Sequence, residues 1–116
     1  MKKLVRDKIP AIIAKSGAIP DFYVAKQTEY EQRLLDKMVE ELEEFREKPC
    51  IEEAADMYSV FQAICDHWQW SLAAVAHASH DKSSARGGFQ ERFILNLDQP
   101  EEEEEDWNVN AHGEQV

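Results

Sequence analysis

Two stretches of helical periodicity, separated only by a short segment around Pro49, constrain the fold of this chain more than any other feature. In residues 28–47 and 51–70, apolar side chains recur every three or four positions, as on one face of an α-helix. Such a face is stable only when it is covered, and a connection this short favours antiparallel packing of the two helices. The sequence therefore predicts an all-α fold built around a helical hairpin.

A weaker pattern predicts a short helix near the N-terminus. Within residues 1–20, Asp7 is the expected cap, Pro10 falls in the first turn, where proline is tolerated, and Gly17 ends the helix. The side of this helix that we expect to be buried consists of Ile9, Ile12 and Ile13.

Start and stop signals mark the remaining helices. Thr28 and Glu31 have the spacing of a capping box at the start of the first long helix. Ser71 is the expected cap of a further helix that reaches Ala85 and ends at Gly87-Gly88. Together these signals predict a small bundle of about four helices.

Two apolar segments and a charged end lie outside the expected helices. The aromatic and branched residues of 21–27 predict an extended connector or a short strand. Residues 89–97 could form a short strand or a docking segment. From residue 99 onwards the chain is charged and of low complexity. We therefore expect one helical domain over residues 1–98 and an acidic, disordered tail over residues 99–116.

The formal net charge of -11 is concentrated at the C-terminal end. Seven of the 24 acidic residues lie in residues 101–116, which contain no Lys or Arg, so 13 basic residues are set against 17 acidic ones before them. A mildly acidic body argues against nucleic-acid binding, which requires a basic face. No segment is long and apolar enough to span a bilayer, and Cys50 and Cys65 are expected to be free thiols. The sequence favours a cytoplasmic protein.

Four carboxylates fall near the apolar sides of the two long helices. When successive residues are placed about 100° apart, Glu41 and Glu44 border the apolar side of the first helix, whereas Glu40 points away. In the second helix Glu53 falls inside the apolar side and Asp56 lies toward its edge. An antiparallel hairpin would bring the two pairs together at the helix–helix interface.

Ionised carboxylates at such an interface need neutralising by protons, basic side chains or metal. Oxygen ligands alone suit hard cations such as Mg²⁺ or Mn²⁺, and Zn²⁺ prefers His and Cys. The simpler interpretation is that the helices dimerise and that salt bridges neutralise their acidic borders. Basic residues that could contact a polyphosphate are Lys82, Arg86, Arg6 and Lys8, although such residues often form only a solvated surface.

The motifs resemble those of a known family. Glu40-Glu41-x-x-Glu44 followed by Glu53-x-x-Asp56 resembles the EExxE…ExxD pattern of the MazG-like all-α nucleoside triphosphate pyrophosphohydrolases. The opening KLVRDKIP and the later Lys82-x-x-x-Arg86-Gly87-Gly88-Phe89 resemble the phosphoribosyl-ATP pyrophosphohydrolase-like branch. The resemblance covers residues 3–95; the acidic tail departs from the family pattern.

This resemblance implies metal-dependent cleavage between the α and β phosphates of a nucleoside triphosphate, giving a nucleoside monophosphate and pyrophosphate. The implied metal ligands are Glu41, Glu44, Glu53 and Asp56, with Glu40 assisting in catalysis and Lys82 and Arg86 contacting phosphate. A homodimer or homotetramer is expected, because a chain of this size builds a long cleft more easily across subunits.

Two alternatives stay open at this point. The first is a non-catalytic helical module whose acidic surface binds a basic partner. The second is the phosphoribosyl-ATP step of histidine synthesis.

Overall fold

Four helices form the framework of the protein in a computed structural model that describes residues 1–98. They are α1 (Ile9–Lys15), α2 (Gln27–Glu47), α3 (Ile51–His67) and α4 (Leu72–Arg86). No strand occurs among these described residues, so the all-α class is confirmed for them, and residues 21–26 and 92–98 follow irregular paths. The predicted disordered tail, residues 99–116, lies outside the described residues.

The chain divides into two units. The first comprises residues 1–80, with α1, α2, α3 and the first half of α4. The second begins at Asp81 and contains the end of α4. Each unit is described by itself below.

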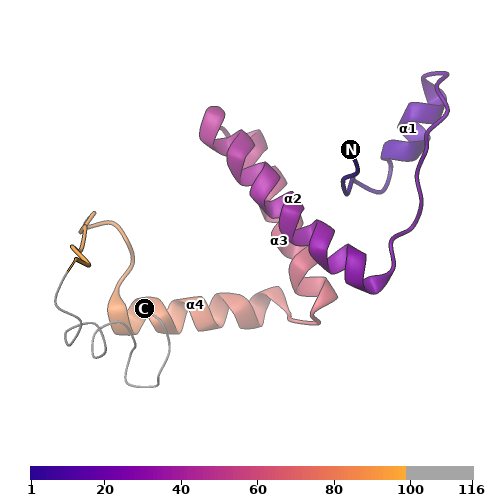
Figure 1. The fold of residues 1–116 in the computed structure, drawn as a ribbon. Coiled ribbons are helices and arrows are strands. Elements are labelled where there is room, and N and C mark those ends of the chain that lie inside the picture. Colours follow the sequence, from indigo (N-terminus) through magenta and orange to yellow (C-terminus); the bar gives the residue numbers. More distant parts are fainter. Residues whose placement is uncertain (99–116) are drawn as a thin grey trace. The chain divides into compact units, whose positions relative to one another are not determined.

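The central structure of the first unit is the predicted hairpin, in which α2 and α3 lie side by side (Figure 1). A three-residue turn, Lys48–Cys50, joins them. Pro49 has no N–H to continue a helix and disfavours helical geometry at the residue before it, where Lys48 has φ -144° and ψ 82°. Among residues 1–98, Leu34 of α2 and Cys65 of α3 are the side chains buried most fully, so each of the two packed helices contributes one of them.

The buried stripe of α2 is narrower than its apolar periodicity suggests. Leu34 and Glu41 are buried and lie seven residues apart, so they occupy one row along the helix. Leu35, Val39 and Leu42 lie beside this row and are exposed by 41–59%. A single neighbouring helix covers only one such row, which leaves the flanking apolar side chains of α2 in contact with solvent.

The predicted burial of the short helix is wrong. α1 has Pro10 in its first turn, as expected, but none of its residues is buried, and Ile12 and Ile13 are exposed by 57% and 37%. Lys8, and not Asp7, is its N-cap residue. Seven residues provide too short an apolar face to pack along the hairpin.

The predicted capping box of α2 is also wrong. The helix begins at Gln27, its N-cap residue Lys26 makes no side-chain cap hydrogen bond, and Glu31 binds His67 of α3. In contrast, Ser71 does cap α4, because its hydroxyl accepts the backbone N–H of Ala74 at 3.0 Å.

Shortly after each of α1, α3 and α4 ends, one residue adopts a positive φ. Gly17 and Gly87 follow α1 and α4 in the left-handed region, with φ of 96° and 86°. α3 ends before Trp70, because Gln69 adopts φ 62° and the Trp70 N–H bonds back to the Cys65 carbonyl at 2.8 Å.

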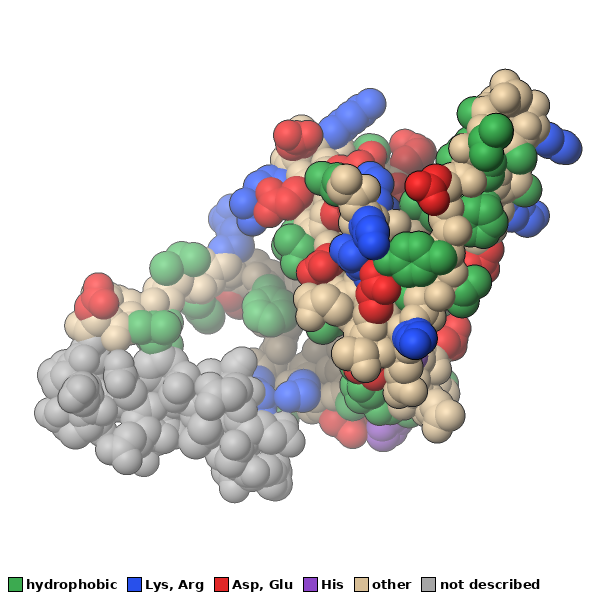
Figure 2. Space-filling model, turned by 45° about the vertical axis from the view of Figure 1, so that its right-hand side comes forward, with side chains coloured by type: hydrophobic (Ala, Val, Ile, Leu, Met, Phe, Trp, Pro, Cys, Tyr) green, Lys and Arg blue, Asp and Glu red, His purple; other side chains and the backbone are tan. Residues whose placement is uncertain are grey.

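The surface mixes charge with exposed apolar side chains. Figure 2 shows Lys and Arg interspersed with Asp and Glu, with hydrophobic side chains between them. In the second unit, exposed apolar side chains continue along residues 89–97. Among the described residues, no helix combines the length and apolar character that crossing a bilayer requires.

Candidate metal centre

The facing sides of α2 and α3 bring together three carboxylates. One oxygen each of Glu41, Glu53 and Asp56 lies within 4.8 Å of the others, and these three side chains are buried or half-buried. Glu53 and Asp56 are three residues apart on α3, so their side chains project from the same side of the helix. Glu41 reaches them from the buried row of α2. The hairpin therefore assembles the cluster from both helices.

A second group of carboxylates continues from the first along α2. Oxygens of Glu40, Glu41 and Glu44 also lie within 4.8 Å of one another. Glu41 is common to both groups, so it connects the acidic residues of α2 with those of α3. The helical projection misjudged two positions: Glu40 is half-buried, whereas Glu44 is exposed. Glu40 is less exposed than expected because two lysines reach it from the N-terminal segment and from α2.

Two carboxylate oxygens in this region are buried without a hydrogen-bond partner. They are Oε2 of Glu41 and Oε2 of Glu53, one on each helix. Glu41 as a whole is only 6% exposed. A buried oxygen without a hydrogen bond is costly, and most such groups in folded proteins have a partner. The two oxygens thus provide acceptor positions for a ligand between the helices.

Burial gives Glu41 an unusual affinity for protons. Desolvation raises its pKa, the negative charges of Glu44 and Asp56 add to this increase, and contact with Lys37 only partly opposes it. Glu40 behaves differently: burial acts to raise its pKa, but the hydrogen bonds from Lys3 and Lys37 prevail and lower it. A proton or a cation is therefore favoured at Glu41, and Glu40 is held as an anion.

Three basic side chains contact the carboxylates. Lys37 Nζ lies 3.2 Å from Glu40 Oε1 and 3.4 Å from Glu41 Oε1. Lys3 Nζ reaches the same Glu40 oxygen at 3.2 Å. From the segment before α1, Arg6 Nη2 donates a 2.7 Å hydrogen bond to Asp56 Oδ1. These contacts neutralise the acidic cluster only in part, since Oε2 of Glu41 and of Glu53 has no partner.

A cavity of about 210 Å³ adjoins the cluster. Its wall combines apolar side chains of the N-terminal segment and both long helices with five charged residues: Arg6, Asp7, Lys37, Glu41 and Asp56. Tyr30 and Ser59 add hydroxyl groups. Charged groups of both signs thus line a small space in which an anion and a cation can bind side by side.

The sequence-derived basic residues have different positions. Arg6 contacts the cluster through Asp56. Lys8 precedes α1 and is exposed. Lys82 and Arg86 lie one turn apart on the part of α4 that belongs to the second unit, so their contact with phosphate stays a prediction.

Sequence reasoning missed Lys3 and Lys37. The spacing of Lys37 three and four residues before Glu40 and Glu41 is that of helical ion pairs and could have revealed it. No sequence signal indicates that Lys3 meets Glu40, because this contact joins residues 37 positions apart.

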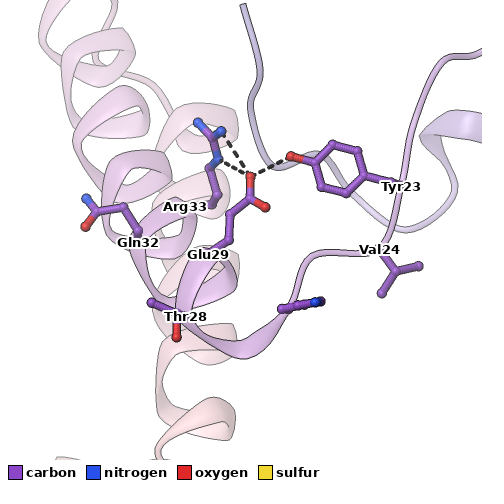
Figure 3. Close-up of a pocket in the computed structure, with 7 residues that line it drawn as sticks. Tyr23, Val24, Thr28, Glu29, Gln32 and Arg33 are labelled. Atoms are coloured by element: carbon purple, nitrogen blue, oxygen red, sulfur yellow. Dashed lines mark hydrogen bonds and ion pairs between the residues drawn. The ribbon is translucent and has the colours of Figure 1, made fainter.

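A second, open pocket of about 780 Å³ lies beside the start of α2. Figure 3 shows Tyr23, from the connector before α2, and Arg33 both pointing at the carboxylate of Glu29. The Tyr23 hydroxyl donates to Glu29 at 2.6 Å and Arg33 Nε at 3.1 Å, and these two hydrogen bonds lower the pKa of Glu29. Through Glu29, these hydrogen bonds tie the connector to the start of α2.

The ends of the two long helices farther from the turn are joined by His67. Its Nε2 lies 2.7 Å from Glu31 Oε2, and this contact lowers the pKa of Glu31. The His67 ring packs edge-to-face against Tyr30 and Trp68. His67 thus has a structural role in the packing of α2 against α3.

Comparison of the chain with protein families, curated proteins and solved structures finds no match.

Proposed function

We propose that the protein is a metal-dependent nucleotide pyrophosphohydrolase, which cleaves the α–β phosphoanhydride of a nucleoside triphosphate to a monophosphate and pyrophosphate. The observation that supports it best is the pair of buried oxygens without hydrogen bonds, Glu41 Oε2 and Glu53 Oε2, inside a cluster contributed by two helices. The motif resemblance points to the same residues.

The donor set suits Mg²⁺ or Mn²⁺. All candidate ligand atoms are carboxylate oxygens, which these hard cations prefer. Glu41, Glu53 and Asp56 would hold the ion, with Glu44 as a further ligand from the adjoining group. A cation bound between the helices would contact the two buried oxygens, Glu41 Oε2 and Glu53 Oε2, which have no hydrogen-bond partner.

The surrounding side chains have distinct roles in the proposed reaction. When bound, the cation neutralises phosphate oxygens and lowers the pKa of a water molecule. Glu40, held as an anion by Lys3 and Lys37, is the candidate residue that accepts a hydrogen bond from the attacking water and orients it. Arg6 and Lys37 present positive charge to the cavity, where phosphate would lie, and Lys82 and Arg86 are proposed as further phosphate contacts.

Release of pyrophosphate tests this proposal directly. We expect the purified protein to release pyrophosphate from at least one member of a panel of canonical and modified nucleoside triphosphates, only when Mg²⁺ or Mn²⁺ is added. Phosphoribosyl-ATP belongs in the panel, since its selective cleavage would identify the histidine-synthesis alternative. If no panel member yields pyrophosphate at saturating metal, the proposed activity is wrong.

A second candidate function, a non-catalytic acidic module for a basic partner, is favoured by one observation. Lys3, Lys37 and Arg6 already pair with Glu40, Glu41 and Asp56. In this interpretation the basic side chains alone neutralise the carboxylates, and added metal would leave the stability of the fold unchanged.

We further propose that the protein is a homodimer or homotetramer through the outer face of α2. Leu35, Val39 and Leu42 are exposed, and they follow one another at spacings of three or four residues. Apolar side chains aligned on one helix face are the usual contact surface between copies of a helical protein.

The oligomeric state is expected to depend on Val39. Replacing this exposed side chain with lysine (Val39→Lys) places charge within the proposed contact and should yield a monomer in sedimentation analysis. Glu47→Lys, at an exposed position two turns further along α2 and about 80° around the helix from Val39, is the matched control and should leave the oligomer intact. A monomeric wild-type protein would contradict this part of the proposal.

A further inference from the structure

The segment before α1 is held against the hairpin chiefly by side chains. Arg33 Nη1 donates to the Lys2 carbonyl at 3.1 Å, Lys3 pairs with Glu40, and Arg6 pairs with Asp56. Leu4 and Val5 line the cavity beside the cluster. Two of the three polar contacts therefore end on carboxylates of the candidate metal centre.

Arg6 and a divalent cation make competing demands on Asp56. The guanidinium binds Asp56 Oδ1 at 2.7 Å, and Asp56 belongs to the same cluster as the unpartnered oxygens of Glu41 and Glu53. A dication held there would lie within a few ångströms of the guanidinium, where like charges repel strongly. Binding of the ion is thus favoured by movement of Arg6 away from Asp56.

Arg6 is also better able to move than Lys37, the other basic side chain that contacts the three-carboxylate cluster. Its side chain is 60% exposed and stands on a non-helical segment. The side chain of Lys37 is only 17% exposed and lies on α2, one turn from both of its glutamate partners. Lys37 is therefore expected to keep its contacts when a cation binds, and Arg6 to give up its own.

We propose that Arg6 is an exchangeable counter-ion: it neutralises Asp56 in the metal-free protein, is displaced when metal binds, and then binds a phosphate group of the substrate in the adjoining cavity. This inference rests on the proposed function, because it assumes the same metal centre. It assigns one side chain opposite effects on two ligands. Loss of Arg6 strengthens metal binding and weakens substrate binding, whereas loss of a merely structural residue weakens both.

Mn²⁺ titration of the full chain, followed by the electron paramagnetic resonance signal of the free ion, tests the first effect. We expect Arg6→Gln to lower the Kd for Mn²⁺ about tenfold, because one repelling charge is removed. Arg6→Lys retains the charge and should stay close to wild type. Arg46→Gln is the matched control, because Arg46 is an exposed arginine of α2 that pairs with Glu43 at 4.0 Å.

The second effect is measured at saturating metal, with the nucleoside triphosphate that the wild-type protein cleaves. We expect Arg6→Gln to raise KM about tenfold, because a charged hydrogen bond to phosphate is lost. If the wild-type protein binds Mn²⁺ and Arg6→Gln binds it equally or more weakly, the counter-ion role is overturned while the metal centre stands. If the wild-type protein binds no Mn²⁺, the proposed function itself fails, and the counter-ion role fails with it.

Discussion

Glu41→Gln is expected to abolish metal binding and turnover while making the metal-free protein more stable at neutral pH. Glutamine has nearly the shape of glutamate but carries no negative charge. The charge is lost at Glu41, the residue that belongs to both groups of carboxylates. We expect turnover to fall about a hundredfold or more, comparable to the loss of a key electrostatic contact in other enzymes. Pyrophosphate release and Mn²⁺ titration measure the two losses.

The gain in stability follows from the pKa of Glu41, which burial and the neighbouring carboxylates raise above the ordinary value of 4.5. The folded state therefore binds the Glu41 proton more tightly than the unfolded chain does. The resulting stabilisation is complete below pH 4.5 and is lost as pH rises through the raised pKa. Above its raised pKa, Glu41 of the wild-type protein is a buried, poorly solvated anion, which glutamine eliminates.

Thermal unfolding across a pH series, without metal, measures this difference. The wild-type protein should lose stability relative to Glu41→Gln as pH rises from about 4.5 toward neutrality. Lys37 retains Glu40 as a partner at 3.2 Å, so the variant does not leave that lysine unpaired. The control is Glu43→Gln, an exposed position of α2, which should leave metal binding and turnover unchanged. Full activity in Glu41→Gln would refute the assignment of the site.

Addition of Mg²⁺ or Mn²⁺ is expected to raise the melting temperature of the wild-type protein by about 10 °C or more. A ligand at one hundred times its Kd stabilises the folded state by about 2.7 kcal/mol, and each kcal/mol shifts the midpoint of a domain this small by about 4 °C or more. The ion binds only where the folded hairpin holds the carboxylates of α2 and α3 together, so the unfolded chain gains little.

Calorimetry with and without the divalent chloride, at matched ionic strength, measures this shift. Glu53→Gln removes one of the two buried, unpartnered oxygens and should abolish most of the shift. Glu43→Gln should retain it. Equal melting temperatures of the wild-type protein with and without metal would favour the interaction-module alternative, in which basic side chains alone neutralise the cluster.

Local patterns in the sequence predicted the helices well. The periodicity of residues 28–47 and the proline at position 49 foretold α2 and its end, and Ser71 caps α4 as expected. These features depend on interactions between residues a few positions apart. The capping box failed because Glu31 has a stronger partner in His67, which lies 36 residues away in the sequence.

In the candidate site, too, local spacing predicted one part of the arrangement and contacts between distant residues decided the other. Helical spacing identified the acids nearest the core, and the hairpin brings Glu41, Glu53 and Asp56 together. The projection did not anticipate that Glu40 is more sheltered than Glu44, because it could not include the N-terminal segment. The projection placed the apolar residues of α2 on one side of the helix, but it could not show that Leu34 is buried whereas Leu35, Val39 and Leu42 are exposed.

The sequence by itself thus determined the helices, their antiparallel pairing and the short set of carboxylates from which a site could be built. The tertiary structure alone decided which carboxylate oxygens are buried without partners and which cations reach them. The physical reason is the separation along the chain of the residues that interact. Helix formation and capping join residues a few positions apart, whereas the surroundings of Glu41 and its cluster come from segments up to 50 positions apart.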